Sequence, residues 1–178
     1  MAKYSVALTV YNGEKFLKNQ LQSLVHQTIL PDELVVCDDR STNDSVSVLE
    51  KFAGKAPFPV RILVNDTNLG YSQNFNRALS SVSGDYVFPC DQDDVWFPTK
   101  IEEMLEVLRG NPEVQVAIHD LEYCKSDLTP IGQTKIERMR ESFDLQRSYV
   151  VGMATVIRRG FLDRCLPVPD AEGISFDD

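Results

Sequence analysis

The chain alternates between short apolar runs and segments with helical periodicity, and this alternation limits its fold more than any other feature. Apolar runs of strand length occupy residues 5–10, 34–37, 60–64, 86–88 and 114–118. Apolar residues with helical spacing lie between them, at residues 17–25, 46–53, 75–82 and 101–108. Strands that are apolar throughout are buried on both faces, and helices between successive strands connect parallel neighbours. The sequence therefore predicts an α/β domain with a mostly parallel central sheet flanked by helices.

The last third of the chain has a weaker pattern. Residues 120–147 are polar and mixed in charge, which indicates a long loop or a hairpin, and a mixed apolar run returns at residues 149–157. No internal repeat or linker separates these parts, so we expect one domain over residues 1–178. Because the sequence ends without a capping helix or a polar tail, we expect the domain to be truncated at its C-terminus.

The composition excludes several classes of protein. Acidic residues outnumber basic ones, 27 to 18, and the net charge of −9 leaves no basic stripe for nucleic acid. No apolar run reaches the roughly 18 residues that a membrane span needs, and the N-terminus resembles a first strand more than a signal peptide. The four cysteines lack disulfide or zinc spacing. We therefore expect a cytoplasmic protein with reduced thiols.

Polar residues follow every predicted strand. In open α/β sheets, ligands bind beyond the carboxyl ends of the strands, so these residues are the candidate site. They are Thr9, Tyr11 and Asn12 after the first strand, Asp38 and Asp39 after the second, Asn65, Asp66, Asn68 and Gly70 after the third, Asp91 to Asp94 after the fourth, and His119 and Asp120 after the fifth. Carboxylates thus recur along one edge of the sheet.

The cluster Asp91-Gln92-Asp93-Asp94 is the sharpest signal in the sequence. Three carboxylates within four residues repel one another in a partly dry cleft unless a pKa rises or a cation binds. Oxygen ligands of this kind favour Mg²⁺ or Mn²⁺. We therefore predict a metal site at Asp91 and Asp93, whereas Asp94 is expected to cap the following helix.

The other acidic pair and the missing motifs narrow the function. Asp39 lies at a strand tip, where its carboxylate can accept a hydrogen bond from a base N–H or a ribose hydroxyl, and Ser41 and Asp44 have capping-box spacing. The chain contains neither the dinucleotide fingerprint nor a P-loop. Asp91 to Val95 also fits the D-x-D-x-V pattern of haloacid-dehalogenase-type phosphatases, although that pattern normally lies on the first strand.

Several motifs in register resemble the inverting glycosyltransferases of family 2, which have the GT-A fold, and in particular their rhamnosyltransferase-like branch. The motifs are Thr9-Val10-Tyr11-Asn12-Gly13-Glu14, Asp38-Asp39-x-Ser41-Thr42-x-Asp44, Asn68-Leu69-Gly70 and Asp91-x-Asp93-Asp94. The resemblance implies that residues 1–97 form a nucleotide-binding half and residues 98–178 an acceptor-side half. It implies donor-nucleotide contacts from Thr9, Val10, Tyr11, Asn12, Glu14, Asp39, Asn68, Gly70, Asn74, Asp91 and Gln92.

The resemblance also implies the remaining site residues. Asp91 and Asp93 would bind Mg²⁺ or Mn²⁺, and Gly152 and Met153 would lie beside the acceptor. Asp178, with Asp177 as its rival, stands where the family's catalytic base belongs. The chain departs from many relatives at Arg40, where Gly is usual, and at Phe75, where Arg is usual.

The expected function is metal-dependent transfer of a sugar, with inversion, from a UDP- or dTDP-sugar to a saccharide or lipid-linked acceptor in polysaccharide biosynthesis. Relatives of this kind often work at the inner face of the membrane, so peripheral membrane association is part of the expectation. Two alternatives stay open at this point. One is a phosphatase that uses Asp91 as its nucleophile, and the other is a non-catalytic fragment that binds a nucleotide sugar.

Overall fold

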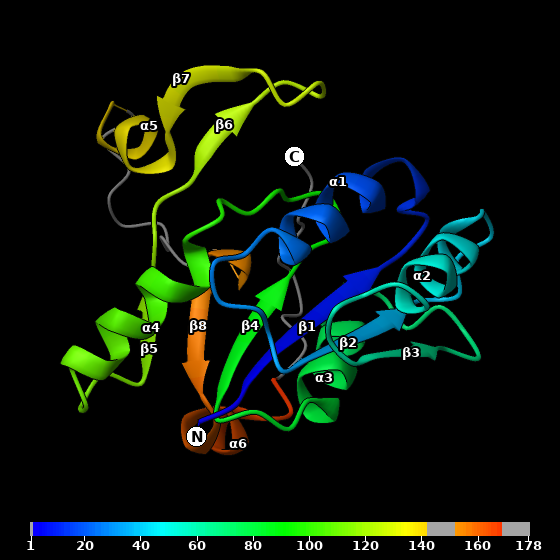
Figure 1. The fold of residues 1–178 in the computed structure, drawn as a ribbon, viewed down its shortest axis with the longest axis horizontal. Helices are drawn as coiled ribbons and strands as arrows, with labels where there is room; N and C mark the ends of the chain where they lie inside the picture. Colours follow the sequence, from blue (N-terminus) through cyan, green and yellow to red (C-terminus); the bar gives the residue numbers. More distant parts are fainter. Residues whose placement is uncertain (1, 142–151, 169–178) are drawn as a thin grey trace.

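A six-stranded sheet forms the centre of the protein, as the computed structural model shows for residues 2–141 and 152–168 (Figure 1). The strand order is β3-β2-β1-β4-β8-β5. The strands are β1 (Tyr4–Val10), β2 (Glu33–Asp38), β3 (Val60–Val64), β4 (Tyr86–Cys90), β5 (Val116–Ile118) and β8 (Thr155–Arg158). Strands β1 to β4 pair in parallel, so the predicted mostly parallel sheet is confirmed.

Strand β8 runs opposite to both of its neighbours. It pairs antiparallel with β4, where Val87 lies opposite Ile157, and with β5, where Ala117 lies opposite Val156. The chain leaves β5 at the carboxyl edge of the sheet and returns from that same edge, so the next strand has to run backwards. The sequence predicted an ordered apolar run here but not its direction.

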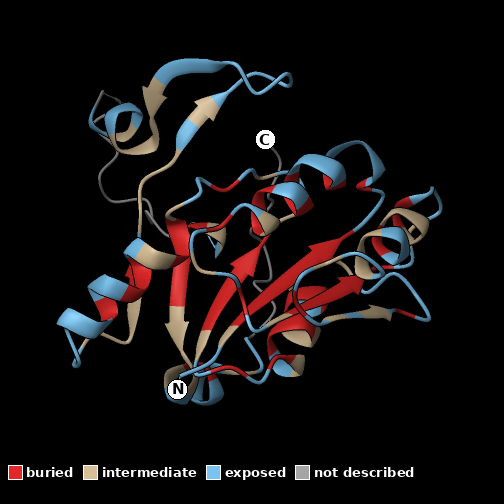
Figure 2. Ribbon diagram, viewed as in Figure 1, coloured by how far each residue is buried: buried red, intermediate tan, exposed pale blue. Residues whose placement is uncertain are grey.

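Helices cover both faces of the sheet because alternate strand residues point to opposite sides. Val6, Leu8 and Val10 of β1 pack with one set of helices, and Ala7 packs with the other. The first set is α1 (Glu14–Val25), α2 (Ser45–Ala53) and α4 (Lys100–Gly110), and the second is α3 (Tyr71–Ser81) and α6 (Arg159–Cys165). Figure 2 shows that the central strands β1, β2 and β4 are almost entirely buried, whereas the edge strand β3 is partly exposed.

A hairpin projects beyond the carboxyl edge of the sheet (Figure 1). Its strands β6 (Glu122–Cys124) and β7 (Pro130–Thr134) pair antiparallel, and the short helix α5 (Lys135–Glu141) follows. A hairpin was one of the two predictions for this stretch, but α5 was not predicted. The chain then re-enters the sheet through a 3-10 turn, η1 (Gly152–Ala154).

Three local predictions differ from the structure. The fifth strand begins at Val116 instead of residue 114, and α3 begins at Tyr71, ahead of its apolar stripe. Helix α4 begins at Lys100 with Thr99 as its N-cap, so the prediction that Asp94 caps this helix is wrong. No helix in the described part of the chain is long and apolar enough to cross a membrane.

The face of α4 that packs on the sheet should dominate the stability of this side of the domain. Leu105 has an exposed fraction of 0%, whereas Val107 on the same helix is 47% exposed. Leu105→Ala is expected to lower the free energy of unfolding by about 2–5 kcal/mol, because it removes buried methyl groups and leaves a cavity. Val107→Ala should change it by less than about 0.5 kcal/mol. Urea unfolding followed by circular dichroism measures both, and equal effects would contradict this packing.

Candidate active site

The carboxyl ends of β1, β2 and β4 surround a cavity of about 410 Å³. We call it the donor-side cavity, and its lining residues are Thr9, Val10, Tyr11, Asp39, Asn68, Gly70, Tyr71, Asn74, Asp91, Gln92 and Asp93. Strands β2, β1 and β4 are neighbours in the sheet, which brings segments far apart in the sequence to one place. All the predicted donor residues line this cavity except Asn12 and Glu14.

Asp39 holds one wall of the donor-side cavity. Its side chain is buried, and its Oδ1 accepts hydrogen bonds from Asn65 Nδ2 (2.6 Å) and from the backbone N–H of Leu69 (2.7 Å). Its Oδ2 accepts one from the backbone N–H of Gly70 (2.9 Å). The carboxylate therefore fixes the loop between β3 and α3. Oδ2 keeps capacity for a further hydrogen bond, since a carboxylate oxygen accepts about two.

Asn74 and Asn68 extend the same wall. Asn74 is buried; its Nδ2 donates to the carbonyl of Cys37 (3.0 Å) and its Oδ1 accepts from Asn65 (3.0 Å). Asn68 donates to the carbonyl of Asp39 (3.3 Å). Gly70, at φ 82°, provides the left-handed residue that precedes α3. These side chains line the cavity, and they also stabilise its shape.

Asn12 and Glu14 connect two loops instead of lining the cavity. The Asn12 backbone N–H donates to Ser41 Oγ (2.8 Å), and Asn12 Oδ1 accepts from the Thr42 N–H (2.8 Å). Glu14 accepts from the Asp44 N–H (3.3 Å). Ser41 Oγ donates to Asp38 (2.5 Å), and α2 starts without a side-chain cap, so the predicted capping box is wrong.

Gln92 joins the loops after β1 and β4. Its Oε1 accepts from the Tyr11 N–H (2.9 Å) and its Nε2 donates to the Tyr11 carbonyl (3.2 Å). Gly13 permits this approach, because a Cβ there would lie 2.1 Å from Gln92 Oε1. The ring of Tyr11 stays 49% exposed at the cavity. Gln92 is thus held in place by the backbone that it touches.

The segment from Asp91 to Phe97, which we call the acidic loop, carries carboxylates in an unfavourable setting. Burial, with the nearby charge of Asp93, raises the pKa of Asp91 to about 6. Burial, with the charges of Asp91 and Asp93, raises the pKa of Asp94 to about 7. Asp94 Oδ2 is buried and has no hydrogen-bond partner in the described part of the chain. A bound cation would relieve both the repulsion and the desolvation.

The acidic loop fits a metal that takes few protein ligands. Within residues 2–141 and 152–168, no three His, Cys, Asp or Glu side chains form a group that could hold a metal ion. Mg²⁺ is commonly bound by one or two carboxylates, with water and substrate phosphates completing its shell. Asp91 and Asp93, which both line the donor-side cavity, would supply those carboxylates.

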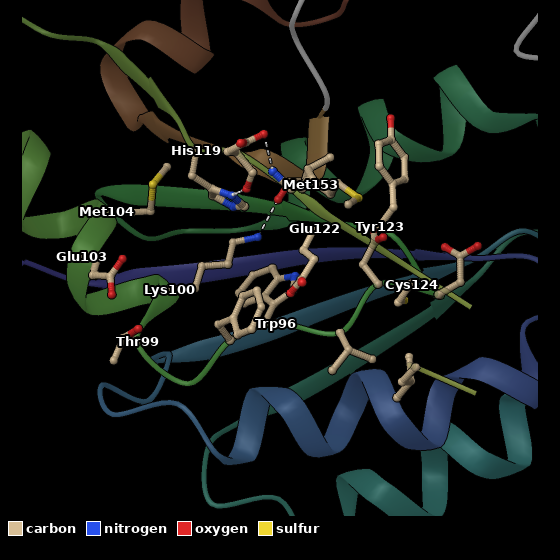
Figure 3. A pocket seen from close by; sticks show the side chains of 17 residues that line it. Trp96, Thr99, Lys100, Glu103, Met104, His119, Glu122, Tyr123, Cys124 and Met153 are labelled. Atoms are coloured by element: carbon tan, nitrogen blue, oxygen red, sulfur yellow. Dashed lines mark hydrogen bonds between the residues drawn. The ribbon is translucent and has the colours of Figure 1, made fainter. Parts of the chain in front are cut away.

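A second cavity of about 510 Å³ lies between α4, the acidic loop and the hairpin (Figure 3). We call it the hairpin-side cavity, and Asp93 lines both cavities. Its other described lining residues are Asp94, Val95, Trp96, Phe97, Thr99, Lys100, Glu103, Met104, His119, Asp120, Leu121, Glu122, Tyr123, Cys124, Leu128 and Met153. Met153, predicted on the acceptor side, is among them, and Gly152 lies beside it in η1.

Lys100 is the functional candidate that the sequence analysis missed. It is only 7% exposed; its Nζ lies 3.7 Å from the centre of the Trp96 ring and donates to the Met153 carbonyl (2.5 Å; Figure 3). Burial lowers its pKa to about 8. A buried ammonium at the first residue of a helix opposes the helix dipole. The sequence signal that could have identified Lys100 is this conflict, because a lysine directly follows Pro98 and Thr99 at a helix start.

Three aromatic residues, Trp96, Tyr71 and Phe75, lie at or near the two cavities. Trp96 packs against Phe88, with ring centres 6.1 Å apart. Tyr71, which the sequence analysis did not single out, is 52% exposed at the donor-side cavity and lies 4.8 Å from Phe75. Phe75, which stands where many relatives have Arg, lies in α3 and is buried in the core.

Asp177 and Asp178, the two candidates for the catalytic base, lie outside the described residues.

Asp39 should contribute to stability as well as to the cavity. Asp39→Asn is expected to lower the free energy of unfolding by about 2–3 kcal/mol, because an amide NH₂ would face the N–H groups that the carboxylate now accepts. The exposed Asp66 on the adjoining loop provides a matched control. Asp66→Asn should change the stability by less than about 0.5 kcal/mol. Denaturant unfolding of the two variants tests this, and equal stability of Asp39→Asn and the parent would contradict it.

Comparison with known proteins identifies relatives across most of the chain. The model of glycosyl transferase family 2 matches residues 5–166. A putative glycosyltransferase, EpsE of Bacillus subtilis, is 31% identical over 114 residues, which are 64% of this chain and 41% of EpsE. A dTDP-rhamnosyl transferase, RfbG of Shigella flexneri, is 30% identical over 159 residues, which are 84% of this chain and 55% of RfbG. The chain therefore spans about half the length of these relatives.

Two solved structures share the fold. The S. aureus TarS fragment 1–349 in complex with UDP superposes with a TM-score of 0.72 at 24% identity, over 91% of this chain and 48% of TarS. A mannosyltransferase from Pyrobaculum calidifontis, in complex with GDP-Man and Mn²⁺, gives a TM-score of 0.73 at 19% identity, over 94% of this chain and 48% of that one. The chain therefore belongs to glycosyl transferase family 2 and has the GT-A fold, which confirms the predicted family and decides against the phosphatase alternative.

Proposed function

We propose that this chain binds a nucleoside-diphosphate sugar in the donor-side cavity and takes part in transferring the sugar, with inversion, to an acceptor hydroxyl. The observation that carries the proposal is the convergence of most of the predicted donor residues on one cavity that Asp91 and Asp93 also line. The names of the relatives support it. RfbG is named a dTDP-rhamnosyl transferase, and the two solved structures contain UDP and GDP-Man.

The nucleoside would lie against Tyr11 and Tyr71. Both rings are about half exposed at the cavity and offer faces on which a base can stack. The free capacity of Asp39 Oδ2 suits the N3–H of uracil or thymine, because that N–H needs an acceptor. We therefore propose a UDP- or dTDP-sugar donor, with Thr9, Val10, Asn68, Gly70, Asn74 and Gln92 completing the pocket.

Asp91 and Asp93 would hold Mg²⁺ or Mn²⁺ against the diphosphate. When bound, the cation offsets the negative charge that develops on the departing nucleotide. The need is large in this chain, because its net charge is −9 and the acidic loop itself is desolvated. Asn12 and Glu14 would act indirectly, since they fasten the loop after β1 to the loop after β2.

The acceptor would bind in the hairpin-side cavity, beside Met153 and Gly152. Asp93 lines both cavities, so donor and acceptor would meet at the acidic loop. Asp178, with Asp177 as the rival, would remove the proton of the acceptor hydroxyl as that oxygen attacks the anomeric carbon from the face opposite the diphosphate. The acceptor would be a saccharide or a lipid-linked saccharide in polysaccharide biosynthesis. A cytoplasmic location, with peripheral attachment to the membrane, stays a prediction.

A second function is compatible with the length of the chain. The chain spans 41% of EpsE and 55% of RfbG, so it also fits a nucleotide-sugar-binding part whose turnover needs further residues. The two functions share the donor-side cavity. Hydrolysis or transfer of a bound donor distinguishes them, since a binding part alone would do neither.

Titration calorimetry with UDP, dTDP and GDP, each with and without Mn²⁺, tests the proposal. We expect UDP or dTDP to bind more tightly with Mn²⁺. Asp93→Asn should weaken Mn²⁺-dependent binding at least about tenfold, the size of effect seen when even a supporting metal contact is lost. Glu113→Gln is the control, because Glu113 is exposed in the turn before β5 and does not line the donor-side cavity.

The two parts of the proposal can fail separately. If none of the three nucleotides binds under any condition, the donor assignment is wrong. If a nucleotide binds equally well with and without Mn²⁺, and equally well to Asp93→Asn, the donor site stands and the metal assignment is wrong.

A further inference from the structure

The hairpin-side cavity has a strongly uneven distribution of charge. Five of its described lining residues are carboxylates: Asp93, Asp94, Glu103, Asp120 and Glu122. Burial lowers the pKa of His119, so its imidazole is neutral at pH 7. Lys100 is therefore the cationic side chain among the described lining residues. Arg138 lies 5.3 Å from the ring centre of Tyr123 but does not line the cavity.

The positive and negative side chains that line the cavity also differ in how far they are buried. Lys100 is buried, and its ammonium is already engaged by the Met153 carbonyl and the Trp96 ring. Glu103 and Glu122 are exposed, and their carboxylates make no hydrogen bond or ion pair within the described chain. Figure 3 shows Glu103 on the α4 side of the cavity and Glu122 on the side of the hairpin. Two carboxylates that have no partner within the described chain therefore line different sides of the cavity.

A divalent cation does not reverse this charge. Bound at Asp91 and Asp93, it would offset those two side chains, but Glu103 and Glu122 would still line the cavity with a single ammonium among its described residues. Asp120 accepts hydrogen bonds from the backbone N–H groups of Leu121 (2.8 Å) and Ile136 (3.0 Å). The described lining therefore stays negative in the loaded state.

We infer that this cavity selects its acceptor by charge: the sugar that enters it is a neutral, polyhydroxylated ring without carboxylate, sulfate or phosphate groups. The inference rests on the proposed function and deepens it, because it assigns the chemical class of the acceptor and names Glu103 and Glu122 as specificity-determining residues. Hydroxyl groups donate to unpaired carboxylates, whereas an anion is repelled by both. Val95, Phe97, Met104 and Leu128 add apolar surface for the non-polar face of such a ring.

The field of the cavity can be measured without knowing the sugar. Cys124 is exposed and lines the cavity, whereas Cys37 and Cys90 are buried. Cys165, which is also exposed, is replaced by Ser. Cys124 should then react about tenfold faster with a trimethylammonium-ethyl methanethiosulfonate than with its sulfonate counterpart, after correction for the ratio at a free thiol, because the carboxylates that line the cavity attract the cationic reagent and repel the anionic one. High salt should reduce the ratio.

Matched variants locate the source of this field. Glu103→Gln and Glu122→Gln should each lower the rate ratio about threefold. Glu106→Gln, one turn along α4 from Glu103 and outside the cavity, should leave it unchanged. A ratio equal to that of a free thiol, or an equal fall in Glu106→Gln, would overturn the assignment of these two residues.

A pair of glycosides tests the acceptor class itself. Octyl β-glucoside and octyl β-glucuronide differ at one carbon, which carries a hydroxymethyl group in the first and a carboxylate in the second. Each glycoside is tested for protection of Cys124 from the reagent and for a change in the fluorescence of Trp96, the single tryptophan. The glucoside should protect at least about tenfold better, and the gap should narrow in the Glu103→Gln, Glu122→Gln double variant. Equal or better protection by the glucuronide, or protection by neither, overturns the inference. Nucleotide calorimetry reports on the donor-side cavity separately, so a failure here leaves the donor assignment standing.

Discussion

The partial removal of two carboxyl groups of the acidic loop from water is the constraint on which the rest of the site depends. Asp91 and Asp94 follow β4, a central strand of the sheet, and burial raises the pKa of both side chains. Lys100 supplies one positive charge nearby, and burial lowers its pKa because its own environment is dry. The loop therefore carries more negative charge than the described protein around it compensates. A divalent cation that binds together with the donor would supply the positive charge that the loop lacks.

The two cavities differ in how firmly their walls are held. On the donor side, Asp39 and Gln92 each hydrogen-bond to the backbone of a neighbouring loop and Asn74 hydrogen-bonds to the backbone of β2, so the wall is cross-linked before any ligand binds. Preorganised groups of this kind lower the cost of ordering a ligand. On the hairpin side, one wall is a two-stranded ribbon that projects from the domain (Figure 1). The donor-side cavity thus has a wall fixed by internal hydrogen bonds, whereas the hairpin-side cavity has one wall on an element that projects from the domain.

The sequence predicted what depends on periodicity and missed what depends on tertiary contacts. The parallel strands β1 to β4, their helices and the cavity at their carboxyl ends followed from apolar runs and from the rule for open sheets. The direction of β8 was missed because it depends on where the excursion after β5 returns. Ser41 and Asp94 were misassigned as caps because short polar residues near a helix start have the same local pattern whether they cap the helix or bind another loop. The family resemblance grouped Asn12 and Glu14 with the donor residues, but a shared motif does not reveal which way a side chain points, and these two do not line the donor-side cavity.

Lys100 departs from the sequence rules for helix starts, and it does so beside the candidate site. A cation at a helix N-terminus, buried against Trp96 and hydrogen-bonded to the Met153 carbonyl, contradicts the dipole preference and the cost of burying charge at the same time. Both unfavourable terms occur at the point where the acidic loop, α4 and η1 meet. Without an ammonium there, the carboxylates of Asp91 and Asp94 would repel each other with no cation beside them from the described chain, and the turn that carries Met153 would lose a hydrogen bond to α4. One buried lysine thus connects the acidic loop at the donor-side cavity to the turn that carries Met153 at the hairpin-side cavity, which is a reason for the two cavities to share one loop.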